Sequence, residues 1–256
     1  MTRKTGAGTR FLLALSAVLL LFGSVSWAAE NENKDQSDIE KRIQNAATVL
    51  DEIMAVKEKA IPDKIMSDAE CIAVVPSMVK VAIGFGGNHG KGVATCKTPN
   101  GWSAPAPIAI TGGSWGLQLG GQAIDLVMLV MNQKGMQALL SSKFKVGADA
   151  SAAAGPVGRQ AAADTDWKMK AEVLTYSRAR GVFAGINLSG SHIAQDKDET
   201  RVLYGKMEPF TDILNGKVAA PNGSRPFLAA VKKYTAPSSQ QGSLRSTTTP
   251  STQASQ

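Results

Sequence analysis

The sequence has few of the residues on which metal and redox sites depend. It contains two histidines and two cysteines in 256 residues. Two histidines cannot build a multi-histidine metal site, and the acidic residues lack the spacing of a calcium-binding loop. Aromatic residues make up only 5% of the chain, and they do not alternate with basic residues as in nucleic-acid-binding surfaces. We therefore expect no metal, no cofactor and no nucleic-acid partner.

The two cysteines, Cys71 and Cys96, are separated by 24 residues. This spacing is not the C-x-x-C of a metal or redox pair, and no histidine cluster accompanies it. In an oxidising compartment the two thiols would form a disulfide, which would stabilise the fold by about 3 kcal/mol. A metal pair and a redox dithiol are the alternatives to this disulfide.

The first 28 residues have the pattern of a signal peptide. Three basic residues precede an apolar run over 11–22, and small residues stand at positions 26 and 28. We expect cleavage after residue 28 and a periplasmic or secreted location; an uncleaved membrane anchor is the competing interpretation. The run is not followed by a cysteine, which excludes a lipoprotein anchor. Cleavage would lower the formal net charge from +7 to +4, because only basic residues are lost.

The rest of the chain is expected to form one domain over 37–235. Residues 236–256 are rich in Ser, Thr, Gln and Pro, so we expect a disordered tail there. The domain should begin with an amphipathic helix over 38–59, because Ser37 and Glu40 form a capping pair. The apolar stripe of this helix consists of Ile39, Ile43, Ala46, Leu50, Ile53 and Met54. The segment 30–59 has a net charge of −3, which argues against contact with an anionic membrane.

The remaining pattern predicts an α+β fold, with a mainly antiparallel sheet as its core and short C-terminal helices. Strands are expected at 71–76, 79–85, 92–96, 124–131, 145–158, 171–177 and 181–193, with an edge segment at 102–111. Residues 86–90, which include three glycines, are expected to form a tight turn. Helices are expected at 62–69, 133–142, 199–204, 209–214 and 225–234.

Two glycine-rich segments match enzyme motifs only in part. Residues 112–116 fit G-x-S-x-G, and Asp125 and His192 follow in the chain order of a hydrolase, but no good helix follows Ser114. A serine hydrolase that uses Ser114 is therefore the least favoured function. Residues 84–92 depart from both nucleotide-binding loops, and we interpret them as a turn that could present Lys91 to an anion.

Positive charge is concentrated over residues 143–180, which have seven basic and four acidic residues. This concentration could form an anion-facing patch. It could equally consist of solvated charges on strands and turns.

Several segments, in order, resemble the SYLF domain family. They are VVP (74–76), GGNHGKG (86–92), WSAP (102–105), GLQLG (116–120), GADA (147–150), GPVGR (155–159) and YSRARGVFAG (176–185). The resemblance implies an α+β lipid-binding domain without catalytic residues. Eukaryotic members are described as binding phosphoinositides and, in some cases, actin filaments. A bacterial envelope offers neither actin nor, usually, phosphoinositides, so anionic phospholipid replaces them in our hypothesis.

The sequence therefore favours an exported, non-enzymatic module that docks on anionic phospholipid headgroups. The cations expected to contact lipid are Lys91, Arg159, Arg178 and Arg180. A periplasmic protein-interaction or envelope-structural protein is the alternative, with a protein partner in place of lipid.

Overall fold

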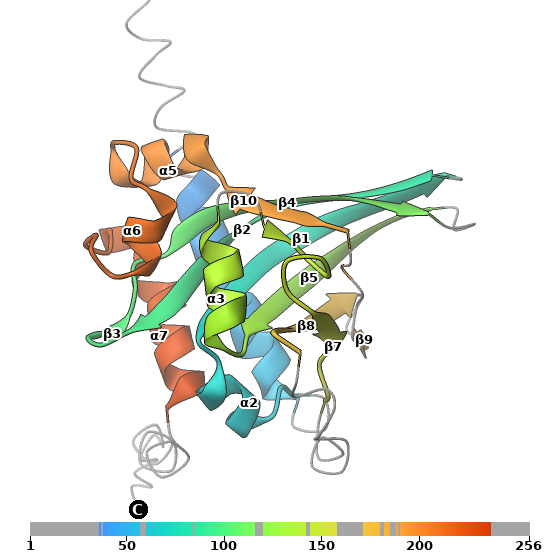
Figure 1. Cartoon of the computed structure of the whole chain (residues 1–256), viewed down its shortest axis with the longest axis horizontal. Coiled ribbons are helices and arrows are strands. Elements are labelled where there is room, and N and C mark those ends of the chain that lie inside the picture. The colour runs from blue at the N-terminus through green and yellow to red at the C-terminus, as the bar shows by residue number, and fades with distance from the viewer. Residues whose placement is uncertain are drawn as a thin grey trace, which may run out of the picture.

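One curled sheet with helices on both sides forms the centre of the computed structural model (Figure 1). The structure describes residues 36, 38–56, 60–83, 85–115, 120–141, 144–157, 171–179, 182–184, 188 and 190–236. All strand pairs but one are antiparallel, which confirms the predicted fold class. The expected signal peptide, Ser37 of the capping pair and the expected tail beyond Ala236 lie outside the described residues.

The strands follow the order β6-β10-β4-β2-β1-β5-β8-β7, with β3 paired to β2 and β9 to β8. Their bounds are β1 Cys71–Ile83, β2 Phe85–Thr98, β3 Gly101–Trp102, β4 Ala106–Trp115, β5 Gly120–Val130, β6 Phe144–Lys145, β7 Ala152–Ala154, β8 Val173–Ala179, β9 Val182–Ala184 and β10 His192–Gln195. The exception to antiparallel pairing is β7 beside β8.

The helices agree with the predicted positions. A helix over 38–55 comes first, and the others are α2 Asp63–Asp68, α3 Gln133–Leu140, α5 Lys197–Tyr204, α6 Phe210–Leu214 and α7 Arg225–Thr235, with a 3-10 turn at Asn222–Ser224 before α7. The helix over 38–55, hereafter the N-terminal helix, ends earlier than predicted. The side chain of Asn132 caps α3 by accepting a hydrogen bond from the backbone N–H of Gly135 at 2.9 Å.

Several predicted strand limits were wrong. The expected tight turn at 86–90 lies inside β2, and the chain reverses between Ile83 and Phe85, which are paired. The expected edge segment 102–111 supplies β4, which lies between β2 and β10. Its prolines are confined to the approach and the first residues of the strand, where a missing N–H costs little.

Two other predicted strands each supply two short ones. The segment 145–158 overlaps only the end of β6 and all of β7. The segment 181–193 divides between β9, which pairs with β8, and β10, which pairs with β4. The chain therefore passes from β8, near one edge of the sheet, to β10, near the other edge.

Each face of the sheet has its own hydrophobic core. The N-terminal helix, α2 and α7 cover one face, which we call the helix face, and the predicted apolar stripe from Ile39 to Met54 is buried there. The other face packs against α3 and α6, through residues such as Leu139, Phe210 and Ile213. The sheet therefore lies between two helical layers over much of its length.

Cys71 and Cys96 form a disulfide, which confirms the predicted pairing. They lie directly opposite each other in β1 and β2, with their Cα atoms 4.0 Å apart. Both side chains are buried in the core under α3 and α6. The disulfide therefore fixes the register of the two strands at the end where β1 begins.

Glycines in β2 allow the sheet to curl where β1 has a bulge. The register of β1 against β2 shifts between Val74 and Val79. A Cβ atom on Gly92 would lie 2.2 Å from the carbonyl oxygen of Val74, and one on Gly90 would lie 2.6 Å from a methyl carbon of Val75. The glycine-rich motif thus serves close backbone packing instead of a turn.

Replacing Gly92 by Ala should destabilise the fold by at least about 2 kcal/mol, because the added methyl group meets a backbone oxygen that cannot move freely. Gly87→Ala is the matched control, since its Cβ would meet nothing nearer than 3.7 Å. We expect the control to change stability by less than about 0.5 kcal/mol. Urea unfolding with the disulfide intact measures both values, and equal losses in the two variants would contradict this packing account.

Candidate functional site

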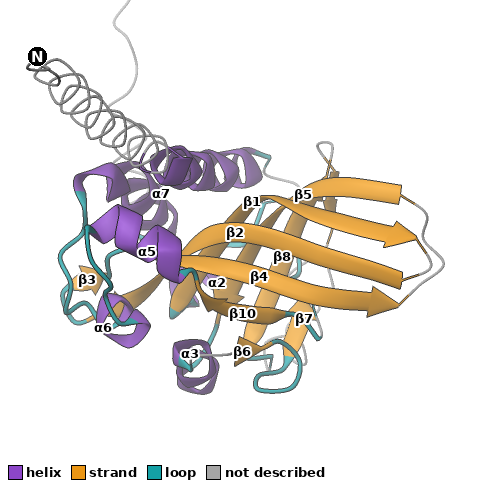
Figure 2. Cartoon of the chain, turned by 90° about the horizontal axis from the view of Figure 1, so that it is seen from above, coloured by secondary structure: helices purple, strands orange, loops and turns teal. Residues whose placement is uncertain are grey.

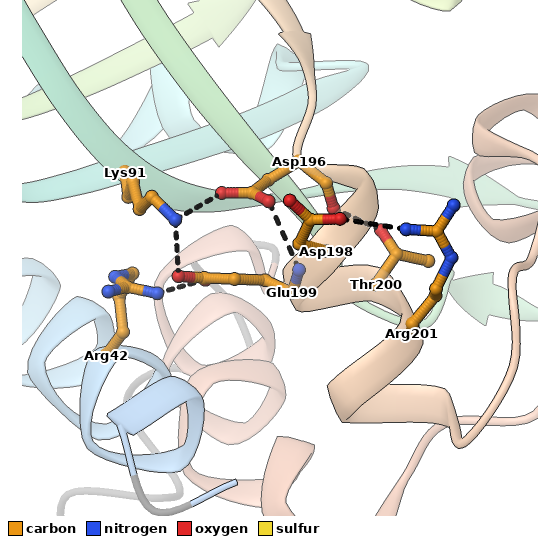
Figure 3. A network of polar contacts seen from close by, with 7 residues as sticks. All are labelled: Arg42, Lys91, Asp196, Asp198, Glu199, Thr200 and Arg201. Carbon is orange, nitrogen blue, oxygen red and sulfur yellow. Dashed lines mark hydrogen bonds and ion pairs between the residues drawn. The ribbon is translucent and has the colours of Figure 1, made fainter. Parts of the chain in front are cut away.

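Lys91, the first of the predicted lipid-binding cations, lies in a cluster of ion pairs on the helix face (Figure 3). Its Nζ atom is 2.8 Å from Oδ2 of Asp196 and 3.0 Å from Oε1 of Glu199. Glu199 also pairs with Arg42 of the N-terminal helix. The cluster joins strand β2 to α5 and to the N-terminal helix.

The charges of this cluster shift one another's titration. Burial opposes ionisation of Asp196, but hydrogen bonds from Lys91 and from the backbone N–H of Glu199 outweigh it, so the pKa of Asp196 is lowered. Burial also opposes the charge on Lys91, yet its hydrogen bonds to Asp196 and Glu199 raise its pKa. The pair is therefore charged over a wider pH range than either group would be alone.

Arg178, the second predicted cation in the described residues, is also paired with two carboxylates. Its guanidinium contacts Oδ2 of Asp125 at 2.7 Å and pairs with Glu52 of the N-terminal helix. Asp125 is opposite Arg178 in the register of β5 and β8, and its Oδ1 atom accepts a hydrogen bond at 3.0 Å from the backbone N–H of Ser77. Ser77 lies in the bulge of β1 with a φ of 52°, so Asp125 stabilises a strained turn of the backbone.

A third contact holds the same helix. Oδ1 of Asp51 accepts hydrogen bonds from Lys233 at 2.8 Å and from the hydroxyl of Tyr234 at 2.5 Å, both from α7. The N-terminal helix is thus tied by side chains to α5, β8 and α7 in addition to its buried stripe.

The structure therefore places Lys91 and Arg178 in separate clusters, each with internal carboxylate partners. Arg159 and Arg180 lie outside the described residues. Sequence reasoning missed the partners of the two described cations. Glu199 is 108 residues from Lys91 and Asp125 is 53 residues from Arg178, so the local sequence contained no signal of either pair.

Beyond these clusters, the strands β4, β2, β1 and β5 continue past the helices (Figure 2). We call this projecting part, which contains residues 79–83, 85–89, 111–115 and 120–123, the ribbon. Its strands follow the order β4-β2-β1-β5.

One cross-strand row at the base of the ribbon is exposed from end to end. In register order it consists of Lys145, His192, Thr111, His89, Val79 and Ala123, which we call the exposed row. It contains both histidines of the protein, and it contains no carboxylate. Sequence reasoning did not bring the two histidines together, because the pairing of β10 with β4 is not encoded by any local pattern.

The partial enzyme motifs correspond to strand positions. Ser114 lies within β4, opposite Gly86 of β2, and three residues from Thr111, which is opposite His192. A nucleophile elbow lies between a strand and a helix, whereas Ser114 is paired with Gly86 near the end of β4 and the next described element is the strand β5. The described residues of the G-x-S-x-G match, 112–115, are therefore part of the ribbon.

Comparison with known proteins decides the family. The family described as "Ysc84: Las17-binding protein actin regulator" matches residues 111–234. The SH3 domain-containing YSC84-like protein 1 of Xenopus laevis is 29% identical over 211 residues, which are 79% of this chain and 63% of that protein. The chain belongs to the Ysc84/SYLF domain family. The resemblance predicted from the sequence is confirmed.

Other relatives extend this similarity to humans and yeast. The SH3 domain-containing YSC84-like protein 1 of Homo sapiens is 28% identical over 210 residues, or 79% of this chain and 61% of that protein. Protein YSC84 of Saccharomyces cerevisiae is 30% identical over 175 residues, or 67% of this chain and 37% of that protein. The chain thus spans about three fifths of the length of these vertebrate relatives. The family description names a binding and regulatory role and no reaction.

The described residues contain neither a membrane-spanning helix nor a metal site. No helix among them is long and apolar enough to cross a membrane. Within the same ranges, no group of His, Cys, Asp and Glu side chains is arranged to hold a metal ion.

The Lys91 cluster predicts a loss of stability in acid. Because the pKa of Asp196 is lower in the folded protein than its ordinary value of about 4, the stability it contributes is present above that value and is lost as the pH falls through the folded pKa. Lys91→Met should therefore lower the free energy of unfolding by about 1–2 kcal/mol at pH 7 and by clearly less at pH 3. Urea unfolding at the two pH values measures this difference.

Lys64→Met is the control, because Lys64 and Asp68 form an exposed ion pair within α2. We expect this variant to change stability by less than about 0.5 kcal/mol at either pH. A loss for Lys91→Met that is as large at pH 3 as at pH 7 would assign the effect of Lys91 to packing instead of charge.

Proposed function

We propose that this member of the Ysc84/SYLF family is an exported, non-enzymatic module that docks on anionic phospholipid surfaces. The observation that carries the proposal is the ribbon, which projects beyond the helices and is built from segments without acidic residues. Residues 77–91 and 109–124 contain no Asp or Glu. A surface without carboxylates can approach a negatively charged membrane without repulsion.

Cations at the base of the ribbon supply the attraction in this proposal. Lys145 is exposed at one end of the exposed row, and Lys80 lies in β1 between Asn88 and Gln122. A lysine near an anionic membrane surface contributes about 1 kcal/mol to binding. Lys91 and Arg178 would contact a phosphate only by giving up their carboxylates, whereas Arg159 and Arg180 stay in the proposal as candidate lipid contacts.

Vesicle co-sedimentation tests the proposal. The processed chain from residue 29 retains every residue that the structure describes. We expect it to bind vesicles that contain phosphatidylglycerol and not vesicles of phosphatidylcholine alone, and to be released by high salt. The double variant Lys80→Glu/Lys145→Glu should bind at least about tenfold more weakly, because two attractive charges become repulsive.

The double variant Lys197→Glu/Lys232→Glu changes the net charge equally, at exposed positions on α5 and α7. We expect it to bind within about twofold of the parent chain. An equal loss in both double variants would mean that only net charge matters, and the ribbon would lose its assigned role.

A protein partner is the second candidate, favoured by the description of the family as a Las17-binding actin regulator. The same assay separates the two functions. A processed chain that binds no vesicle of either composition, at low salt as well as high, would exclude lipid docking and favour the protein partner.

Export is part of the proposal and has its own test. The leader pattern predicts that the protein recovered from the periplasm or the medium of a bacterial host begins at Ala29. N-terminal sequencing measures this directly. Recovery of an intact N-terminus from the membrane fraction would favour the uncleaved anchor.

A further inference from the structure

Both histidines of the chain lie on one face of the sheet, with a single strand between them. His192 of β10 is opposite Thr111 of β4, which is in turn opposite His89 of β2. Residues directly opposite each other in an antiparallel sheet point to the same face. Neighbouring strands lie about 4.8 Å apart, so the Cα atoms of the two histidines are separated by about 10 Å, with Thr111 between them.

The side chains of these three residues are available to a ligand. All three are exposed, and none of their side chains makes a hydrogen bond or an ion pair with another described residue. A charged imidazole has two N–H donors and no acceptor, and the threonine hydroxyl adds one more donor. Two imidazoles on either side of a hydroxyl can turn toward one small group above it. This arrangement suits an anion that accepts several hydrogen bonds, such as a phosphate.

The approach to the histidines from the ribbon is open. Two residues further along their strands, on the same face, lie Gly113 of β4 and Gly87 of β2, which are opposite each other. Both glycines are exposed, and a Cβ atom on either would meet nothing nearer than 3.7 Å. Neither glycine presents a side chain that would stand between the histidines and an approaching flat surface.

The charged groups on the helix side of the row are mostly paired with one another. The nearest are those of the cluster in Figure 3, namely Lys91, Arg42, Asp196 and Glu199. In the same helix α5, Arg201 pairs with Asp198 at 2.8 Å. Lys197, the first residue of α5, is exposed.

The two ends of the row also combine both signs of charge. At the β6 end, Lys145 lies opposite the histidine of β10, and its backbone N–H donates to Oδ2 of Asp149 at 2.6 Å. At the β5 end, Arg178 pairs with Asp125 and Glu52. Basic and acidic groups around the row are therefore equal in number among the described residues. The attraction of the row for an anion depends on the charge of its histidines.

Histidine is the residue type whose charge changes between pH 5 and pH 8. Carboxylates ordinarily titrate near pH 4, below this range, and lysine and arginine titrate far above it. A fall from pH 7.5 to pH 5.5 therefore adds up to two positive charges to the row and leaves most of the surrounding charges unchanged. A phosphodiester keeps its negative charge over the same range.

We propose that His89, Thr111 and His192 bind the phosphate groups of an anionic phospholipid surface, and that this docking strengthens as the pH falls through the range in which histidine gains its charge. This inference rests on the proposed function and adds both the groups that hold the lipid phosphate and their regulation by pH. Hydrogen bonds from a charged donor to a phosphate are about twice as strong as those between neutral groups. Lys91 is already held by two carboxylates, whereas the histidines have no such partner among the described residues.

Vesicle co-sedimentation at two pH values tests the inference. We expect the processed chain to bind phosphatidylglycerol vesicles at least about tenfold more tightly at pH 5.5 than at pH 7.5, because up to two cations are added at the surface. In the double variant His89→Gln/His192→Gln this ratio should fall below about twofold. Both positions are exposed, so the urea midpoint should not change. An equal pH dependence in the parent and the variant would overturn the inference.

Permanent charges at the same positions provide the complementary measurement. His89→Arg/His192→Arg should bind at pH 7.5 about as tightly as the parent chain binds at pH 5.5. The matched control is Gln137→Arg/Asn215→Arg, which adds two cations at exposed positions of α3 and the end of α6, on the other face of the sheet. It should stay within about twofold of the parent at pH 7.5. An equal gain in both variants would assign the effect to net charge and overturn the inference.

The imidazole NMR signals distinguish a lipid headgroup from a free phosphate, since the chain contains only these two histidines. We expect inorganic phosphate at pH 5.5 to shift both signals and to compete with the vesicles. If phosphate shifts them while vesicle binding is the same at both pH values, the site binds a soluble phosphate and its assignment to lipid is overturned.

Failure of the inference and failure of the proposed function give different results. A parent chain that binds anionic vesicles equally at both pH values, with imidazole signals that phosphate does not move, would overturn the inference and leave the proposed function in place. A parent chain that binds no vesicle at either pH would remove both.

Discussion

The close packing of β2 against the bulge of β1 sets the shape on which the other features depend. Gly92 lies against the backbone of Val74, and Gly90 lies against the side chains of Val75 and Met78, so a larger residue fits at neither position. The sheet curls there, so one face receives the N-terminal helix, α2 and α7 while the other receives α3 and α6. The disulfide lies on one side of this crossing and the ribbon on the other. A larger side chain at this point would disturb the sheet and both cores.

The bulge is also where the sheet is joined to the N-terminal helix. Ser77 donates its backbone N–H to Asp125, which pairs with Arg178, and Arg178 pairs with Glu52. A half-buried charge is costly to leave unpaired. Removing any one partner from this series of contacts would therefore destabilise the fold, because it would leave another charge without its partner. Lys91 repeats the arrangement with Asp196 and Glu199. Lys91 and Arg178 therefore stabilise the fold through their carboxylate partners.

Sequence reasoning succeeded where the signal was local. The buried stripe from Ile39 to Met54 and the C-terminal helices each depend on residues a few positions apart. The glycine run at 86–90 was misassigned because glycine suits both turns and close backbone packing, and the sequence alone does not distinguish them. The pairing of His192 with Thr111 joins segments 81 residues apart, and no short pattern encodes such a register.

The predicted site was affected by the same limitation. A basic residue in a sequence indicates positive charge, but its availability depends on carboxylates that folding brings near it. Lys91 and Arg178 were expected to contact lipid, and in the fold both face acids from distant segments. The ribbon was divided in the prediction between a turn, an edge segment and an enzyme motif. The order of the strands β4, β2, β1 and β5 shows that these fragments belong to one continuous part of the sheet.

The arrangement also distinguishes two ways in which a membrane could be contacted. Contact through the N-terminal helix would require its apolar stripe, which includes Ile43, Leu50 and Ile53, to leave the core. Exposing each of these side chains would cost about 1.5–3 kcal/mol, and the ion pairs of Arg42 and Glu52 would be broken as well. The exposed row at the base of the ribbon is already accessible and needs no rearrangement. For the same gain from lipid contact, docking through the ribbon is therefore the more favourable of the two.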